Sequence, residues 1–385
     1  MSWRNHEDQA DRAAARGDVA TAATMLERAI ELAPPTVDRW LKLAALRRAA
    51  GRPKLALAAI DGALAIDPLH FMALMSRAHV LESDGDANEA ARTFMRALAQ
   101  LRDEEALPAR LTALVAHARE MGARYVAAET AKRDAIVTAL CELSAPERRR
   151  LDRFNSNVLR TTRVFHSEPT HYHFPGLIER EFHERDAFPW LSVLEDATDA
   201  IREEFLALQA LTDARAEPYI QYDASLPTRQ WTTLNHSRDW TAFHLVRNGL
   251  VVAENAGRCP RTMAALSAVD QPSITGRGPN AMFSVLKPRT RIPPHTGVAN
   301  TRLVCHLPLI VPPACRFRVG AETRGWEVGR AFVFDDTIEH EAANDSDETR
   351  VVFIVDCWHP GLSPAERHAI GALMEAEEAT GGAPL

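Results

Sequence analysis

The pattern of apolar and polar positions changes character along this chain of 385 residues. Over the first third, small and large apolar residues recur every 34 positions, which is typical of helices packed in pairs. After about residue 240, short runs in which apolar residues alternate with others dominate, and they indicate β-strands. We therefore expect an α+β protein, with an all-helical N-terminal region followed by a β-rich C-terminal region.

Columns of small residues define the helical repeat. They are Gly17, Gly51 and Gly85; Ala22, Ala56 and Ala90; and Ala29, Ala63 and Ala97. A period of 34 residues is that of tetratricopeptide repeats, in which small residues let two helices approach closely and glycine turns the chain. We expect a tetratricopeptide-like solenoid over residues 1–122, with a groove that binds an extended or helical peptide. The alternative is a helical spacer that only supports the C-terminal domain.

Two capping boxes mark helix starts beyond the repeats. Ser144 precedes Glu147 by three residues, and Ser363 precedes Glu366 by the same spacing. Residues 123–160 are therefore expected to be a helical connector. Residues 161–385 are expected to form the second domain, which has one helix near Val193 to Leu211. The short alternating runs after Trp240 favour a double-stranded β-helix of the jelly-roll type.

Two histidines and an arginine in this β-rich region suggest a metal site. His295 is followed by Thr296-Gly297, and His340 lies one hairpin later. Neutral imidazoles bind iron, copper, zinc and nickel, and a pair of them leaves several coordination positions open. Arg350 shares a strand face with Val352 and Ile354; if that face is interior, its buried guanidinium needs an anion such as a carboxylate. A chelating keto-diacid satisfies both groups.

At this point the chain resembles the aspartyl/asparaginyl β-hydroxylase family. The segments that carry the resemblance are Phe174-Pro175-Gly176-Leu177, Phe188-Pro189-Trp190, Asp239-Trp240-Thr241-Ala242-Phe243, Phe283-Ser284-Val285-Leu286-Lys287-Pro288, Pro294-His295-Thr296-Gly297, Asn300-Thr301-Arg302-Leu303, His306-Leu307, Phe334-Asp335-Asp336 through Glu339-His340-Glu341, and Val355-Asp356-Cys357-Trp358-His359-Pro360. The resemblance implies a dioxygenase that depends on Fe(II) and 2-oxoglutarate, and a jelly-roll oxygenase domain over residues 161–385. Family members with similar repeats ahead of the oxygenase imply a protein or peptide substrate.

The resemblance also implies roles for individual residues. It makes His295 and His340 the iron ligands, and it places Ser284 and Arg350 on the distal carboxylate of 2-oxoglutarate. It places His306 at the carboxylate next to the metal, Trp240 in the wall of the co-substrate pocket, and Arg302 on the carboxylate of the substrate aspartyl residue. The chain departs from the family at Val304, where a second arginine is expected. Arg302 then has to serve either the co-substrate or the substrate.

The residue at position 297 leaves the metal without a third protein ligand. Many non-haem iron oxygenases have a carboxylate two residues after the first histidine, and here that residue is glycine. The resemblance implies water in the vacant position, although iron halogenases with a small residue there keep halogenation open as a rival chemistry. The acidic residues Asp335, Asp336 and Glu339 are expected to orient the histidines rather than to bind the metal.

Composition and charge narrow the possible partners. A net charge of −7 and a pI near 6.1 argue against a nucleic-acid partner. The N-terminal residues lack the apolar run of a secretion signal, and no segment is apolar enough to span a bilayer, so we expect no membrane partner. The five cysteines show no paired metal-binding motif and are expected to be reduced thiols in the cytoplasm.

Together these patterns predict a cytoplasmic oxygenase. Fe(II) and 2-oxoglutarate are the expected cofactors, O2 is the second co-substrate, and a peptide or protein bound by the repeat groove is hydroxylated at the β-carbon of an aspartyl or asparaginyl residue. Two alternatives remain: an oxygenase or halogenase that acts on a small molecule or lipid, and a repeat adaptor whose β-domain only binds a ligand.

Overall fold

A computed structural model describes residues 2–101, 108–212, 216–223 and 229–378 of the chain. The chain divides into two compact units, Met1–Thr161 and Thr162–Leu385. The described residues of the first unit form helices and no strands, and the second unit is rich in strands, so the α+β expectation is confirmed at this level.

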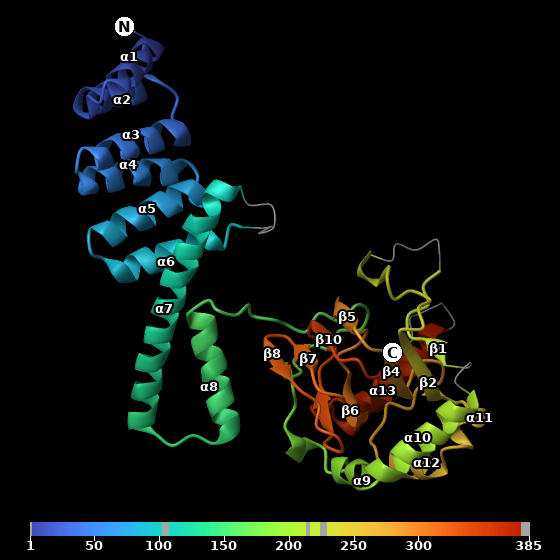
Figure 1. The fold of residues 1–385 in the computed structure, drawn as a ribbon. Helices are drawn as coiled ribbons and strands as arrows, with labels where there is room; N and C mark the ends of the chain where they lie inside the picture. The colour runs from blue at the N-terminus through green and yellow to red at the C-terminus, as the bar shows by residue number, and fades with distance from the viewer. Residues whose placement is uncertain (1, 102–107, 213–215, 224–228, 379–385) are drawn as a thin grey trace. The chain divides into compact units, whose positions relative to one another are not determined.

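The first six helices of unit 1 form three antiparallel pairs, which Figure 1 shows stacked one after another. They are α1 (Trp3–Ala15) with α2 (Val19–Leu32), α3 (Val37–Ala49) with α4 (Pro53–Ile66), and α5 (Phe71–Ser83) with α6 (Ala87–Leu98).

The repeated small residues have the structural roles that the sequence predicts. Gly17, Gly51 and Gly85 each follow the first helix of a pair, with φ angles of +78°, +66° and +91°. Glycine adopts this left-handed conformation at no steric cost. The six repeated alanines are completely buried, and without larger side chains they allow the helices to pack closely: Ala22, Ala29, Ala56, Ala63, Ala90 and Ala97.

Two further helices complete unit 1. The long helix α7 (Ala109–Leu140) packs against α6 and is followed by α8 (Ala145–Val158). The predicted capping box opens α8, where Ser144 and Glu147 exchange hydrogen bonds at the helix N-terminus. Within residues 123–160, the stretches 123–140 and 145–158 are helical.

Unit 2 contains two β-sheets. The larger sheet has the order β1-β2-β4-β11-β6-β9 with β3 beside β2, and the smaller has the order β5-β10-β7-β8. The strands of the larger sheet are β1 (Glu217–Pro218), β2 (Trp240–Arg247), β3 (Leu250–Val251), β4 (Ala281–Leu286), β6 (Arg302–Ile310), β9 (Phe332–Phe334) and β11 (Arg350–Trp358). Those of the smaller sheet are β5 (Thr290–His295), β7 (Cys315–Val319), β8 (Glu322–Arg324) and β10 (His340–Asn344).

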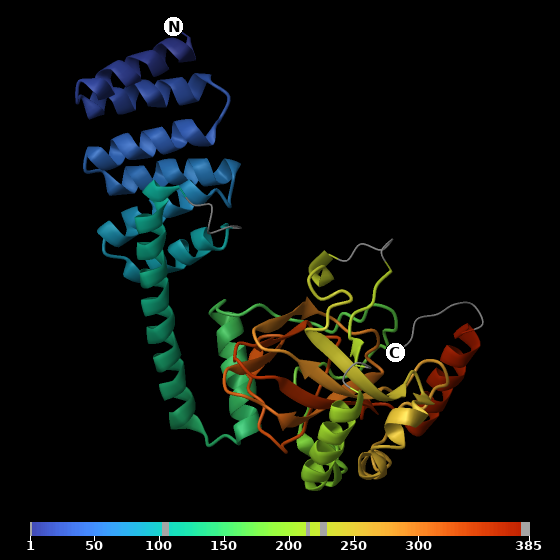
Figure 2. The same cartoon turned by 45° about the vertical axis from the view of Figure 1, so that its right-hand side comes forward.

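Helices cover one face of the larger sheet. Residues of α9, α10 and α12 pack with this face in one hydrophobic core, and Figures 1 and 2 show α10 and α12 on the same side of the strands. The helices of unit 2 are η1 (Arg185–Ala187), α9 (Leu191–Asp196), α10 (Thr198–Thr212), η3 (Arg229–Trp231), α11 (Ala253–Ala256), α12 (Pro260–Leu266) and α13 (Pro364–Glu378). The single helix expected near Val193 to Leu211 is thus two helices, interrupted at Ala197.

A second core lies between the two sheets, and the alternation of β11 shows how the strand separates the two cores. Val351, Phe353 and Val355 belong to the core under the helices, whereas Val352 and Ile354 belong to the core between the sheets. Arg350 is in phase with the second set and therefore projects between the sheets. The more specific assignment to a double-stranded β-helix stays a prediction.

Candidate functional site

A cavity of about 290 Å³ lies between the two sheets of unit 2. It brings together all the residues that were expected to bind the metal, the co-substrate or the substrate. Those residues are Trp240, Ser284, His295, Arg302, His306, His340 and Arg350.

The strand register places the two candidate metal ligands side by side. His295 ends β5 and His340 begins β10, and their Cα atoms are direct partners in the antiparallel ladder. Their ring centroids are 4.0 Å apart. Each Nδ1 faces a main-chain carbonyl two residues earlier, that of Pro293 at 2.8 Å and that of Ile338 at 3.1 Å. Because Nδ1–H donates to the carbonyl, the lone pair is on Nε2, the tautomer that binds a metal.

Burial keeps both imidazoles neutral. It lowers the pKa of His295 to about 3, with a further contribution from His340, and it lowers the pKa of His340 to about 4. The structure also shows that carbonyls, and not the acidic residues expected from the sequence, accept the hydrogen bonds that orient the two rings.

Among the described residues, the two histidines have no third protein ligand beside them. In the described parts of the chain, no Asp, Glu, Cys or further His completes a three-residue ligand set with His295 and His340. Position 297 has no room for a side chain, since a Cβ atom there would overlap the carboxylate of Asp336. Glycine at this position therefore leaves space for the Asp336 carboxylate.

Arg350 is a buried cation without a carboxylate partner among the described residues. The residue is only 2% exposed, and its Nε has no hydrogen-bond partner. Its guanidinium lies 4.9 Å from the ring of Trp326, which gives a cation–π contact but no negative charge. Burial lowers the pKa of Arg350 to about 10. An unpaired charge in an apolar setting is costly, so this group is suited to an anionic ligand.

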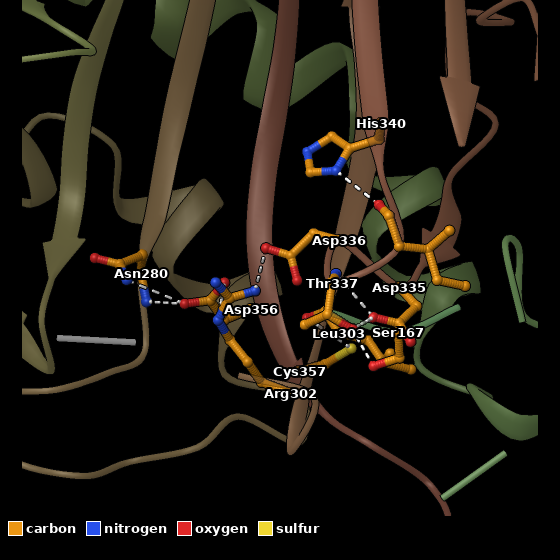
Figure 3. Close-up of polar contacts among 11 residues, drawn as sticks. Ser167, Asn280, Arg302, Leu303, Asp335, Asp336, Thr337, His340, Asp356 and Cys357 are labelled. Atoms are coloured by element: carbon orange, nitrogen blue, oxygen red, sulfur yellow. Dashed lines mark hydrogen bonds and ion pairs between the residues drawn. The ribbon is translucent and has the colours of Figure 1, made fainter. Parts of the chain in front are cut away.

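Arg302 lies in the same cavity but, unlike Arg350, has carboxylates beside its guanidinium. It donates to Asp336 at 2.9 Å and has Asp356 at 3.7 Å, and all three residues are buried (Figure 3). Burial alone would lower the pKa of Arg302, but the two carboxylates outweigh it and raise the pKa. Asp356 also accepts from the main-chain N–H and side chain of Asn280. The role of Arg302 at a substrate carboxylate stays a prediction, whereas its charge is already paired within the protein.

Trp240 and Ser284 form a hydrogen-bonded pair from adjacent strands of the larger sheet. The indole Nε1 of Trp240 donates to the hydroxyl oxygen of Ser284 at 3.0 Å. Because the indole nitrogen is only a donor, the hydroxyl proton of Ser284 remains free to donate to another group. Tyr219 stacks on Trp240 with 3.8 Å between ring centroids and holds the indole in place.

The tautomer of His306 follows from its neighbour Trp326. The indole Nε1 of Trp326 faces His306 Nδ1 at 3.3 Å, and since indole is only a donor, Nδ1 must accept and Nε2 must carry the proton. Burial, with the positive charge of Arg350, lowers the pKa of His306 well below its usual value. His306 is therefore a neutral hydrogen-bond donor in the cavity wall.

The sequence did not identify several residues of the site. Tyr219, Trp231 and Trp326 line the cavity from loops or short elements, where neither periodicity nor spacing marks them. Trp231 contacts His295 edge to face, with centroids 4.9 Å apart. Asp356 could have been found, because a charged residue in the middle of an otherwise apolar strand is a sign of a buried polar role.

Comparison with known proteins links this geometry to a family. Residues 195–360 match the family model described as "Aspartyl/Asparaginyl beta-hydroxylase". A relative from Homo sapiens, aspartate beta-hydroxylase domain-containing protein 2, is 39% identical over 38% of this chain and 41% of its own length. The ornithine lipid ester-linked acyl 2-hydroxylase of Rhizobium tropici is 36% identical over 49% of this chain and 63% of its own length. The chain thus spans less than two thirds of each of these relatives.

Solved structures resemble the helical unit only weakly. The tetratricopeptide repeat domain of Arabidopsis OM64 has 18% identity and a TM-score of 0.26, and the match covers 31% of this chain and 92% of that domain. None of the described helices is both long and apolar enough to cross a membrane. Residues 195–360, which contain the paired histidines as well as Arg302 and Arg350, are thus similar to the aspartyl/asparaginyl β-hydroxylase family, in agreement with the motifs.

Proposed function

We propose that this protein is an Fe(II)- and 2-oxoglutarate-dependent dioxygenase that hydroxylates a peptide or protein. One observation carries the proposal. The buried Arg350, which lacks a carboxylate partner among the described residues, lines the same cavity as two neutral histidines whose Nε2 atoms are left for a metal. A metal and a dianion together supply what these groups lack.

The residues present fit both cofactors. His295 and His340 would hold Fe(II), and 2-oxoglutarate would bind to the metal through its keto acid group. Arg350 and Ser284 would bind the distal carboxylate, since Ser284 keeps a free hydroxyl proton, and His306 would donate to the carboxylate nearer the metal. When bound, the metal and co-substrate supply the activation of O2 and the oxidative decarboxylation that drive C–H hydroxylation.

The contribution of the chain itself is orientation and exclusion of water. Strand pairing fixes the two imidazoles, and carbonyl hydrogen bonds fix their tautomers. The aromatic side chains of Tyr219, Trp231 and Trp326 surround these groups and reduce access of water. A dry site strengthens the attraction between the Arg350 guanidinium and a carboxylate.

A peptide or protein is the first candidate substrate, modified at the β-carbon of an aspartyl or asparaginyl residue. The names of the family and of the human relative support the position of hydroxylation. The helical pairs of unit 1, with their tetratricopeptide-like period, support a peptide ligand, because such arrays present grooves to peptides.

A lipid acyl chain or other small molecule is the second candidate substrate. The Rhizobium relative is named for hydroxylation of an acyl chain, and it is matched over nearly half of this chain. In the cavity, Arg302 is already paired with Asp336 and Asp356, and position 304 is valine, so a carboxylate substrate would have to compete with two internal carboxylates. Hydroxylation is favoured over halogenation because the Asp336 carboxylate already occupies the space beside Gly297 in which a halide would have to fit.

Succinate release from 2-oxoglutarate in the presence of Fe(II) tests the proposal. Arg350→Ala should raise the 2-oxoglutarate concentration needed for half-maximal release by roughly 30- to 150-fold, because hydrogen bonds to a charged group contribute about 2–3 kcal/mol. Arg291→Ala is the matched control, since Arg291 is exposed and paired with Asp345. The control should be indistinguishable from the wild type.

The substrate class is decided by adding candidates to the same assay. A library of peptides containing Asp or Asn, and separately a set of hydroxyl-free acyl amides and esters, should be examined for a mass gain of about 16 Da, the mass of one oxygen atom inserted by such an oxygenase. A mass gain that is seen only in the acyl compounds would contradict the peptide substrate and support the lipid substrate. Absence of succinate under all conditions, or unchanged co-substrate kinetics in Arg350→Ala, would contradict the oxygenase proposal and favour an adaptor.

A further inference from the structure

A second group of metal-binding side chains lies in unit 1, in a part of the sequence to which the proposed reaction gives no role. His79 and Glu82 belong to α5, and His117 belongs to α7. One ligand atom from each lies within 4.8 Å of those of the other two, and among the described residues no other set of three or more His, Cys, Asp and Glu has this spacing.

The helices present these three groups at one place. His79 and Glu82 are three residues apart, so they share a face of α5. His117 is 35 residues beyond Glu82 and approaches from α7 with its Nε2 at 2.9 Å from both oxygens of the Glu82 carboxylate. His79 Nδ1 lies 3.6 Å from the same carboxylate. The two imidazole planes are nearly parallel, with centroids 5.7 Å apart.

A fixed hydrophobic base supports the cluster. The ring of Phe94, which is completely buried, contacts His79 edge to face at 5.0 Å and His117 at 5.6 Å. The three ligand side chains themselves are 27–39% exposed, so an ion can reach them from solvent. His79 Nε2 is buried without a hydrogen-bond partner, which leaves one polar atom of the cluster unsatisfied.

The separations suit a tetrahedral transition metal. Ligand atoms about 2.0–2.1 Å from a zinc ion are about 3.3–3.4 Å from one another in a tetrahedron. The contacts of 2.9 and 3.6 Å to the Glu82 carboxylate bracket that value. Burial lowers the pKa of His79, although the Glu82 carboxylate opposes this shift. Two imidazoles and one carboxylate form a ligand set that zinc sites use.

The geometry points to a divalent transition-metal site of the zinc class formed by His79, Glu82 and His117, separate from the His295 and His340 pair. A bound ion would hold α7 against α5, two helices that are not consecutive in the chain. It would thereby stabilise the last helical pair of the repeat array. This inference is independent of the proposed oxygenase activity.

Cobalt(II), whose visible absorption reports its coordination, tests the site in the full-length chain. In a protein stripped of metal by a chelator and carrying His295→Ala and His340→Ala, Co(II) should bind with one equivalent and be displaced by Zn(II). Adding His117→Ala should weaken binding at least about 100-fold, since even loss of a group that only orients a ligand costs 10–100-fold. Glu82→Gln should weaken binding in the same direction, because it removes the negative charge.

Glu120→Gln is the matched control, because Glu120 lies on α7 near His117 but pairs with Arg124 instead. It should leave Co(II) affinity unchanged. A second measurement uses the otherwise unaltered chain, in which the number of bound Zn(II) equivalents should fall by one upon His117→Ala. Absence of the His117-dependent equivalent, or equal binding by the His117→Ala, Glu82→Gln and Glu120→Gln proteins, would overturn the inference.

Discussion

Two clusters of side chains line the same cavity of unit 2, and they differ in whether their buried cation has carboxylate partners within the protein. The paired cluster consists of Arg302, Asp336 and Asp356, in which a buried cation lies between two carboxylates. The unpaired cluster consists of His295, His340 and Arg350, in which two neutral imidazoles and a buried cation have no carboxylate bound to them within the described residues. Arg302 and Arg350 are both buried, so the difference between the two cations lies in their partners.

The directions of the two arginine pKa values express this difference. Arg302 has a raised pKa because its carboxylates outweigh burial, whereas the pKa of Arg350 falls to about 10 because burial has no comparable opposition. A buried charge whose partners are internal contributes to the fold, and one without partners is ready for a ligand. Substitutions in the paired cluster should therefore affect stability first, and those in the unpaired cluster should affect turnover first.

The largest effect is expected from His340→Ala. Loss of one of two histidine ligands should reduce succinate release by more than about 100-fold, since changes to groups that only orient ligands already cost 10–100-fold. Stability of the metal-free protein should change much less than activity. Activity and urea unfolding should be measured on the same preparation. Substantial turnover in this variant would remove His340 from the metal site.

Arg302→Met should show the opposite balance. Removing the cation leaves Asp336 and Asp356 buried without compensation, which should lower the free energy of unfolding by about 3–5 kcal/mol. Adding Asp336→Asn and Asp356→Asn should restore part of the loss, because the uncompensated charges are then gone. Arg350→Met is the contrasting variant, and its unfolding free energy should be unchanged or higher. Equal destabilisation by the two arginine variants would contradict the comparison between the clusters.

The loss of folding stability at acidic pH should also depend on the unpaired cluster, through His340. A histidine titrates near pH 6.5 when unfolded, whereas burial lowers the pKa of His340 to about 4. The stability that this imidazole supplies is present above pH 6.5 and is lost as pH falls toward 4, because only the unfolded chain then takes up the proton. At pH 5 the loss is about 2 kcal/mol.

Comparing the pH dependence of stability between the wild type and His340→Gln isolates the contribution of His340. Burial raises the pKa of Asp335 to about 7, so protonation of this carboxyl stabilises the folded protein as pH falls over the same interval. In the wild type this gain partly offsets the stability that is lost through the histidines. His340→Gln should therefore lose about 2 kcal/mol less than the wild type between pH 7 and pH 5, when metal-free proteins are unfolded with urea. Identical pH dependences would show that His340 is not buried as the fold places it.

Sequence patterns predicted those features that follow from local periodicity. The 34-residue repeat predicted the helical pairs and the glycines at their turns, and the alternation in β11 predicted that Arg350 shares a face with Val352 and Ile354. The pairing of Arg302 with Asp336 and Asp356 could not be predicted, because it joins residues 34 and 54 positions apart through strand register. The cluster of His79, Glu82 and His117 could not be predicted for a related reason, because His117 lies on α7 and reaches the other two residues only through the packing of α7 against α5.

The smallest effect is expected from Trp240→Phe, which tests how a neighbour of the unpaired cluster prepares the site for an anion. Trp240 donates its only polar hydrogen to Ser284, which fixes the Ser284 oxygen as an acceptor and leaves the hydroxyl proton for an anion beside Arg350. Phenylalanine keeps an aromatic ring against Tyr219 but frees the hydroxyl to rotate. The half-saturating 2-oxoglutarate concentration should rise by roughly 2- to 12-fold, which corresponds to a neutral hydrogen bond of about 0.5–1.5 kcal/mol. Ser284→Ala should raise it at least as much, and combining the two substitutions should add little, because both act through one hydroxyl. Full additivity would mean that Trp240 contributes independently of Ser284.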